Sequence, residues 1–177
     1  VREAICRNHS SVHLLQKTLQ ENLGTEVHQA GSKVDEKTFR FDFSYRGRLS
    51  DELIAKLEEN VNKKVKAGLT TKIEHMPLDE AKAKGAMALF GEKYGDTVRV
   101  IQYGDSIELC GGTHVEATGN IGMFKILSEG AVAAGIRRIE ATTGANAEEV
   151  LYAAEDMIMQ IRSFFNNTPN LAGSIKK

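Results

Sequence analysis

Hydrophobic residues recur with helical spacing in three long stretches of the chain. Residues 3–22 carry one apolar stripe, which ends at Gly24, a residue suited to stop a helix. Ser50 is a suitable N-cap for a second helix that runs toward Gly68. Residues 147–165 carry a third and broader apolar stripe. The pattern therefore predicts a helix near each end of the chain and one between them.

Strict alternation of apolar and polar residues predicts strands elsewhere. Residues 38–45 alternate most sharply, and residues 26–30 are expected to form the strand before them, across a turn that contains Gly31 and Ser32. One face of the later strand carries four aromatic residues, namely Phe39, Phe41, Phe43 and Tyr45. Such a row either stacks the bases of a nucleic acid or packs in a core. Core packing is the interpretation favoured here.

Five further short strands are expected, over residues 70–75, 97–102, 106–109, 122–128 and 137–142. A short helix over residues 78–84 and a glycine-punctuated loop over residues 85–96 separate the first two, and Leu89 and Phe90 are expected to pack within that loop. The loop lacks the glycine and lysine spacing of a phosphate-binding P-loop. Small residues, 130–135, separate the last two strands. The elements together predict an α+β fold in which an antiparallel sheet is flanked by helices.

Composition and charge narrow the class of protein. The 177 residues are 41% hydrophobic with a formal net charge of −1, which is typical of a globular domain but not of a general DNA binder with a broad basic surface. Two cysteines are too few for a disulfide framework. No apolar run approaches the roughly 20 residues of a membrane span, and no signal-peptide stretch is present. We therefore expect a cytoplasmic protein with no membrane and no DNA partner.

The two ends of the chain indicate a piece of a longer protein. The chain begins with Val1 rather than methionine, and it stops at Lys177 soon after the last predicted helix. That helix is apolar enough to need a surface to pack against, either the body of the domain or a partner. We expect one domain over residues 1–144, followed by the start of a truncated C-terminal helical region over residues 145–177.

The candidate chemistry centres on Cys110 and His114, which lie four residues apart across two glycines. Glycines disfavour a helix here, and a tight turn after a strand aims both side chains at one point. His9 and His13 lie four residues apart in the first predicted helix, so both imidazoles face one side, about 6 Å apart along the axis. A set of one cysteine and three histidines suits zinc by ligand softness and number.

Other residues compete with this set or fall outside it. Cys6 lies one helical turn before His9 and is a weaker candidate ligand. His28 and His75 are expected to have no metal role. The opposing interpretation is that all four candidates are ordinary packed side chains that bind no metal, which elemental analysis of the purified protein would decide.

The assembled motifs resemble those of the editing domains of alanyl-tRNA synthetases and of the free-standing proteins that hydrolyse mischarged alanine tRNA. The resemblance covers nearly the whole chain. Its segments are Arg7-Asn8-His9, Phe41-Asp42-Phe43-Ser44, residues 85–96, residues 110–115 and Arg137-Arg138-Ile139-Glu140-Ala141. Threonyl-tRNA synthetases share a similar pair of histidine and cysteine motifs. The residues between Cys110 and His114, which are Gly111-Gly112-Thr113, resemble those of the alanine enzymes.

The resemblance implies an editing-domain fold and a set of site residues. The ligands of the implied Zn²⁺ ion are His9, His13, Cys110 and His114. The resemblance also implies that Gln29 faces the substrate. The family usually has threonine where this chain has Val12, and the hydroxyl groups expected to replace it belong to Ser10, Ser11 or Thr113.

The implied activity is hydrolysis of the ester that links serine or glycine to the acceptor end of tRNA(Ala). A pocket for alanine cannot exclude glycine and discriminates against serine by only about 1–3 kcal/mol, so a second, hydrolytic site is needed. Water held or polarised by zinc is expected to attack the ester, with no side-chain base assigned. The backbone at Gly111, Gly112 and Thr113 is expected to orient the amino acid. The weaker candidates for tRNA contacts are Lys93, Arg137 and Arg138.

Ligation of alanine to tRNA(Ala) with ATP is expected in the remaining domains of the parent synthetase, because no ATP-binding signature is present here. Four protein ligands usually make a closed structural zinc site, whereas catalytic sites keep one position open. The alternative function is therefore a zinc-stapled tRNA-binding module without hydrolytic activity.

Overall fold

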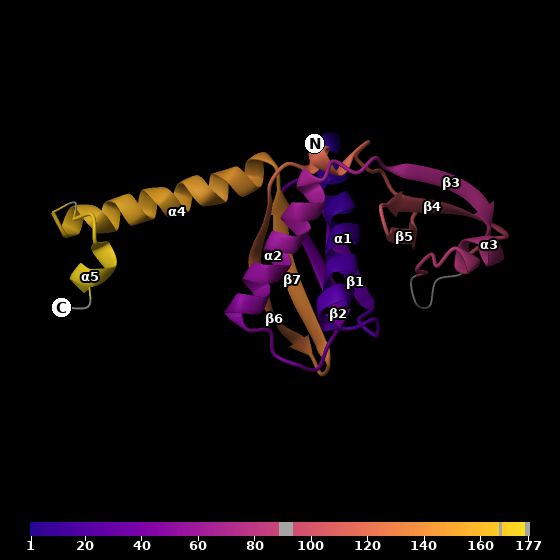
Figure 1. Ribbon diagram of the computed structural model, residues 1–177, viewed down its shortest axis with the longest axis horizontal. Coiled ribbons are helices and arrows are strands. Elements are labelled where there is room, and N and C mark those ends of the chain that lie inside the picture. Colours follow the sequence, from indigo (N-terminus) through magenta and orange to yellow (C-terminus); the bar gives the residue numbers. More distant parts are fainter. Residues whose placement is uncertain (89–93, 167, 176–177) are drawn as a thin grey trace.

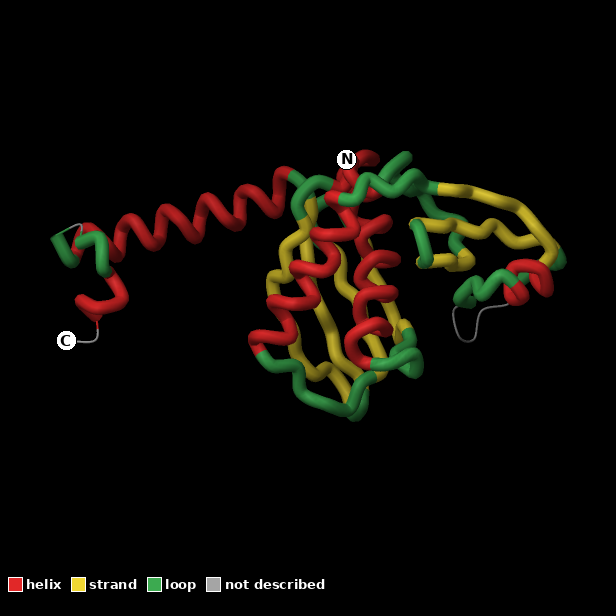
Figure 2. Tube along the Cα trace, viewed as in Figure 1, coloured by secondary structure: helices red, strands yellow, loops and turns green. Residues whose placement is uncertain are grey.

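The computed structural model describes residues 1–88, 94–166 and 168–175, which form two antiparallel sheets with helices packed against them. Figure 1 and Figure 2 show the arrangement. The elements in chain order are α1 (Arg2–Leu23), β1 (Gln29–Val34), β2 (Phe39–Ser44), α2 (Asp51–Lys66), β3 (Lys72–Pro77), α3 (Leu78–Ala83), β4 (Thr97–Tyr103), β5 (Ser106–Leu109), the 3-10 turn η1 (Thr118–Ile121), β6 (Phe124–Ala133), β7 (Ile136–Thr143), α4 (Ala145–Phe164) and α5 (Leu171–Ile175). The expected α+β class with antiparallel sheets flanked by helices is confirmed.

The larger sheet has the strand order β1-β2-β7-β6, and α1 and α2 cover one of its faces (Figure 1). The aromatic residues of β2 point into this layer, where Phe39, Phe41 and Phe43 are fully buried. Core packing of the aromatic row is therefore confirmed for these three side chains. Ser50 caps α2 as predicted, because its hydroxyl oxygen accepts a hydrogen bond from the backbone N–H of Leu53 at 3.2 Å.

The smaller sheet, β3-β4-β5, lies beside α1 and contributes side chains to two hydrophobic cores. Successive side chains of a strand point to opposite faces. Val98 and Val100 of β4 pack into a small core with residues of β3, α3 and β5, whereas Ile101 and Tyr103 pack into the main core. Because β4 is buried on both faces, it holds β5, and the turn that follows β5, close to α1.

The first hairpin differs from its prediction. β1 begins at Gln29 rather than at residue 26, and it includes Gly31 and Ser32, which were expected to form the turn. The turn lies at Asp35 instead, where the carboxylate accepts hydrogen bonds from the backbone N–H groups of Lys37 and Thr38, each at 2.9 Å. β1 is an edge strand, and such a strand accommodates glycine with an irregular register, which here falls between Gln29 and Gly31.

The small residues 130–135 also differ from their prediction, because most of them belong to a strand. β6 continues to Ala133, and the turn to β7 is confined to the residues before Ile136, with Gly135 at a φ of 71°. Gly130 and Ala131 pair with the long side chains Arg138 and Arg137 of β7. The other predicted elements occur where expected, with ends that differ by a few residues.

Part of the predicted loop 85–96 pairs with β5. The backbone N–H of Met87 donates to Ile107 O and its carbonyl accepts from the N–H of Leu109, both at 2.9 Å. The predicted packing of Leu89 and Phe90 concerns residues outside the described part of the chain.

The last long helix, α4, extends away from both sheets (Figure 1). Ala147 is its one buried residue, and several large apolar side chains beyond it are exposed. These exposed side chains are Val150, Tyr152, Met157, Ile158, Met159, Ile161 and Phe164. No helix in the described part of the chain is long and apolar enough to cross a membrane.

Candidate metal centre

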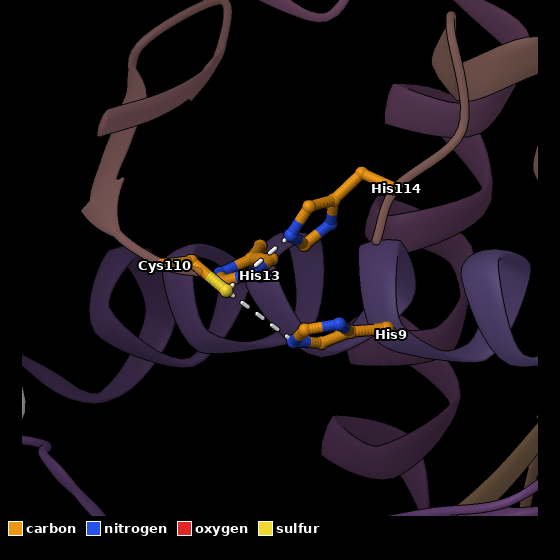
Figure 3. A group of neighbouring side chains, drawn as sticks. All are labelled: His9, His13, Cys110 and His114. Atoms are coloured by element: carbon orange, nitrogen blue, oxygen red, sulfur yellow. Dashed lines mark hydrogen bonds between the residues drawn. The ribbon is translucent and has the colours of Figure 1, made fainter. Parts of the chain in front are cut away.

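Two segments about a hundred positions apart in the chain bring four candidate ligands together. α1 presents His9 and His13 on one side, and the turn after β5 presents Cys110 and His114 toward them (Figure 3). One potential ligand atom from each side chain lies within 4.8 Å of all the others. The helical spacing of the histidines and the bend of the glycine-containing turn both act as predicted.

The interatomic distances fit a zinc site. In a tetrahedral zinc site with usual bond lengths, a sulfur and a nitrogen ligand lie about 3.5 Å apart. Cys110 Sγ lies 3.5 Å from His9 Nε2 and 3.3 Å from His114 Nε2. One thiolate and three imidazoles are donors that zinc accepts. The cluster can therefore hold a metal ion of this class.

The surroundings of the two ring nitrogens of His13 also indicate a metal-binding site. Its Nδ1 lies 2.6 Å from a carboxylate oxygen of Glu108, and both side chains are nearly buried. Its Nε2 is buried and has no hydrogen-bond partner within the described ranges. A ligating histidine typically donates its other ring N–H to a carboxylate, which fixes the tautomer and the ring orientation. In the neutral tautomer that this bond selects, the buried Nε2 carries the lone pair that binds an ion.

The electrostatics of the cluster favour a thiolate. Burial alone would raise the pKa of Cys110, but the neighbouring imidazoles of His114, His13 and His9 lower it to about 3. Burial lowers the pKa of His13, but the Glu108 carboxylate and the Cys110 thiolate together raise it to about 10. Burial lowers the pKa of His114. A thiolate held among imidazoles is the protonation state that metal binding requires of cysteine.

The turn that carries the ligands is held by close backbone contacts. A Cβ at Gly112 would lie 2.1 Å from Cε1 of His9, so only glycine allows the imidazole to approach the turn. Arg99 Nη1 donates hydrogen bonds to the carbonyl oxygens of Cys110 at 2.7 Å and Gly112 at 2.8 Å. Sequence reasoning did not assign a role to Arg99.

Ser10 ties the helix to the same turn. Its buried hydroxyl oxygen accepts hydrogen bonds from the Tyr103 hydroxyl at 3.0 Å and from the backbone N–H of Val115 at 3.1 Å. It also lies 3.4 Å from Nδ1 of His114. Ser10 therefore helps to position the candidate ligand His114.

A cavity of about 720 Å³ lies beside the cluster, between α1, β1 and β5. Its lining residues are Gln16, Gln20, Thr25, His28, Gln29, Ala30, Ser44, Met87, Ala88, Glu108 and Leu109. Gln29, predicted to face the substrate, is among them. Glu108 connects this cavity to the cluster through its bond to His13.

The structure does not bring all the predicted substrate residues to this cavity. Ser11 is fully buried, and its hydroxyl donates to the carbonyl of Arg7 at 2.9 Å. Val12 packs in the main core. Gly111 and Thr113 are exposed at the turn. Substrate contacts by Ser11 and Val12 stay predictions, and neither side chain is among the residues that line the cavity.

The two arginines predicted to contact tRNA bind carboxylates on opposite faces of β7. Arg137 forms a bidentate ion pair with Glu129. Arg138 forms a bidentate pair with Asp42, with N–O distances of 2.6 and 2.8 Å. Lys93 lies outside the described residues. Their contacts with tRNA stay predictions.

The remaining candidate ligands lie outside the cluster. Cys6 packs against the main core and is not one of the four grouped side chains. His75 is exposed on β3, and His28 is exposed at the cavity wall.

Glu108 and Gln16 are the site residues that sequence reasoning missed. Glu108 shares the inward face of β5 with buried Ser106, so an acidic residue at a buried strand position was the available signal. Gln16 follows His13 by three positions, which places it on the same side of α1.

Comparison with known proteins agrees with this arrangement. The family model described as "Threonyl and Alanyl tRNA synthetase second additional domain" matches residues 98–140, which run from β4 to β7. Over 99% of its length the chain is 54% identical to an alanine–tRNA ligase of Bacteroides fragilis, and over 96% it is 52% identical to that of Porphyromonas gingivalis. An alanine–tRNA ligase of Exiguobacterium sibiricum is 56% identical over 85% of the chain.

The chain spans about a fifth of the length of these ligases, with coverage of 20%, 20% and 17%. Residues 98–140 of the chain thus match the threonyl and alanyl tRNA synthetase second additional domain, and the chain is similar over nearly its whole length to part of alanine–tRNA ligases.

Proposed function

We propose that this chain is an editing domain that hydrolyses the ester of Ser-tRNA(Ala) or Gly-tRNA(Ala). The observation that carries the proposal is the junction of a zinc-compatible cluster with a cavity large enough for an aminoacyl group and part of its ribose. Similarity to alanine–tRNA ligases supports the choice of tRNA.

Different residues of the chain would bind the metal ion and orient one of its ligands. His9, His13, Cys110 and His114 would hold the ion, and Glu108 orients His13 through Nδ1. A bound zinc ion supplies Lewis acidity toward the ester carbonyl and toward an attacking water.

Residues of the cavity would place the ester beside the cluster. Gln29 lines the wall, with its amide nitrogen 3.4 Å from the hydroxyl oxygen of Ser32. The exposed backbone of Gly111 and Thr113 lies on the turn that carries the cluster.

A hydrolytic site is needed because binding alone cannot separate alanine from glycine and serine well enough. A pocket that accepts alanine also admits glycine, and an added hydroxyl on serine changes affinity by only about 1–3 kcal/mol. Ester hydrolysis after transfer to tRNA adds the missing discrimination.

The proposal also includes the activity of the parent protein, its partners and its location. The parent protein would ligate alanine to tRNA(Ala) with ATP in its other domains, which are partners of this one together with the charged acceptor end. A cytoplasmic location fits a tRNA substrate and two free cysteines.

A second candidate function is a zinc-stapled tRNA-binding module without hydrolytic activity. Four protein side chains fill the tetrahedral shell of a structural zinc site, whereas catalytic zinc sites usually have three protein ligands. Hydrolysis at this centre therefore requires a fifth coordination position or the release of one ligand.

The deciding experiment measures deacylation of seryl-tRNA(Ala) and alanyl-tRNA(Ala) by the chain, with zinc and after chelation. We expect faster loss of the seryl ester, dependence on zinc, and a loss of at least about a hundredfold in Cys110→Ala. Cys6→Ala is the matched control, because Cys6 is a cysteine outside the cluster. Seryl-tRNA(Ala) that persists while elemental analysis shows bound zinc would favour the binding module.

A further inference from the structure

We propose that the side-chain carbonyl of Gln16 is the hydrogen-bond acceptor for the α-ammonium group of the aminoacyl ester. The identity of the ligand rests on the proposed function, whereas the acceptor itself follows from the contacts of Gln16. Among the described residues, the buried side-chain atoms without a hydrogen-bond partner are Nε2 of His13 and Oε1 of Gln16. The first belongs to the metal cluster, and the second has no other role in the fold.

The orientation of the Gln16 amide is fixed by one hydrogen bond. Gln16 is 5% exposed, and its Nε2 donates to the backbone carbonyl of Val27 at 3.2 Å. The opposite atom, Oε1, is therefore the free end of the amide, and no group in the described part of the chain donates to it. Leaving a buried acceptor unpaired destabilises the fold, so such a group in a native structure calls for a ligand or a water.

Gln16 lines the cavity and lies on α1 three residues after the candidate ligand His13. On α1 the residues His9, His13 and Gln16 follow at spacings of four and three, which places them along one side of the helix. Gln16 and Glu108 both line the cavity, and Glu108 is bonded to His13. A group bound to Gln16 Oε1 would thus lie next to the cluster.

The acceptors around this point favour a cationic donor. The two carboxylate oxygens of Glu108 already have partners, His13 Nδ1 at 2.6 Å and the Ser106 hydroxyl at 3.3 Å. The carbonyl of Gln16 is neutral, buried and unpaired, and the carboxylate of Glu108 lines the same cavity. A primary ammonium has three N–H donors and a positive charge, which suits this pair.

The α-ammonium is the donor that the proposed substrates share. Seryl and glycyl esters both carry it, whereas only serine carries a side-chain hydroxyl. A buried and unpaired acceptor in the cavity wall rejects a ligand without the matching donor more strongly than an apolar wall does. Gln16 would therefore select for a free amino group rather than for either side chain.

The test uses two non-hydrolysable probes, titrated calorimetrically into the zinc-loaded full chain. One probe is adenosine with serine joined to its 3′ position through an amide, and the other is the same compound with hydrogen in place of the α-amine. We expect the wild type to bind the amine probe about ten- to a hundredfold more tightly. Gln16→Met, which removes the acceptor but keeps the length of the side chain, should reduce this preference to about threefold or less.

Gln20→Met is the matched control. Gln20 lies one turn later on α1, and its Nε2 donates to the same Val27 carbonyl at 3.0 Å. Gln20 also lines the cavity, so this variant can change the affinity for both probes alike. It loses a hydrogen bond to the same carbonyl but no unpaired buried acceptor, and it should retain the ratio of the two affinities. Zinc content and Tm of both variants, compared with wild type, show whether the fold and the cluster are intact.

Two results would overturn the assignment. One is a Gln16→Met variant that keeps the full preference for the amine probe, as expected if a buried water occupies Oε1. The other is failure of the zinc-loaded wild type to prefer the amine probe. Deacylation of seryl-tRNA(Ala) is measured on the same preparations, so a chain that does not hydrolyse the ester but shows Gln16-dependent amine preference contradicts the proposed hydrolysis and supports this assignment.

Discussion

The first and last long helices of this chain have similar apolar patterns and opposite surroundings. α1 has ten buried residues along its middle, where α2, the larger sheet and the turn after β5 all contact it. α4 is nearly as long, but Ala147 is its one buried residue. Ile158 of α4 is 51% exposed, whereas Leu15 of α1 is fully buried.

The difference shows that an apolar stripe predicts a helix but does not predict whether other elements bury that stripe. α1 combines its apolar stripe with a polar side that includes His9, His13 and Gln16, and the fold covers both sides. On α4 the apolar residues beyond Leu151 have no cover within the described chain. The contribution of a residue to the free energy of unfolding should therefore increase with its burial.

The largest loss of stability is expected from His13→Ala on the polar side of α1. It leaves the nearly buried Glu108 carboxylate without its partner, and removal of one member of a buried pair costs about 3–5 kcal/mol. Urea unfolding of the chelated protein at pH 7 measures the effect. His75→Ala, at an exposed position of β3, is the control and should change the free energy of unfolding by less than about 0.5 kcal/mol. Equal losses in the two variants would contradict the assigned pair.

The apolar sides of the two helices can be compared directly. Leu15→Ala removes a fully buried side chain and should cost about 2–5 kcal/mol. Ile158→Ala removes an exposed side chain from α4 and should cost less than about 0.5 kcal/mol beyond its small effect on helix propensity. The midpoints and slopes of urea unfolding curves give both values. Similar costs for both variants would show that α4 is covered in solution.

A partly exposed ion pair should have an intermediate and pH-dependent effect. Hydrogen bonds from Arg138 hold the pKa of Asp42 below its ordinary value of 3.8. A carboxyl group with a lowered pKa in the folded state stabilises the fold above its ordinary pKa, and this contribution is lost as the pH falls through the folded-state value. Asp42→Asn should therefore cost about 0.5–1 kcal/mol at pH 7 and less at pH 3. Unfolding curves at the two pH values test it, and a cost that does not change with pH would contradict it.

The smallest effect is expected when the outer part of α4 is removed. A chain that ends after Leu151 keeps Ala147 and the hydrogen bonds of Asn146 to the carbonyls of Glu36 and Lys37. Its free energy of unfolding should differ from that of the full chain by less than about 0.5 kcal/mol. Calorimetric or urea unfolding provides the comparison. A loss above about 1 kcal/mol would place the outer part of α4 against the body of the domain and end the contrast with α1.

Local sequence was sufficient for most elements and for the alignment of each pair of candidate ligands. Helical spacing aligned His9 with His13, and the two glycines bent the chain between Cys110 and His114. It failed at the first turn, because Gly31 and Ser32 are also compatible with an edge strand and the Asp35 turn was the stronger local structure. Residues 130–135 were misjudged for a similar reason, since small residues fit both a turn and a strand that faces arginines.

Local periodicity and ligand spacing by themselves determined that this chain has an amphipathic first helix, a sharply alternating strand and two halves of a metal cluster. These features depend on residues close together in the chain, where backbone geometry dictates which side chains share a face. Only the tertiary structure decided that Glu108 supports His13, that the Gln16 carbonyl is left unpaired beside a cavity, and that α4 is uncovered. Those outcomes depend on how distant elements pack, because burial and hydrogen-bond pairing are properties of the assembled fold.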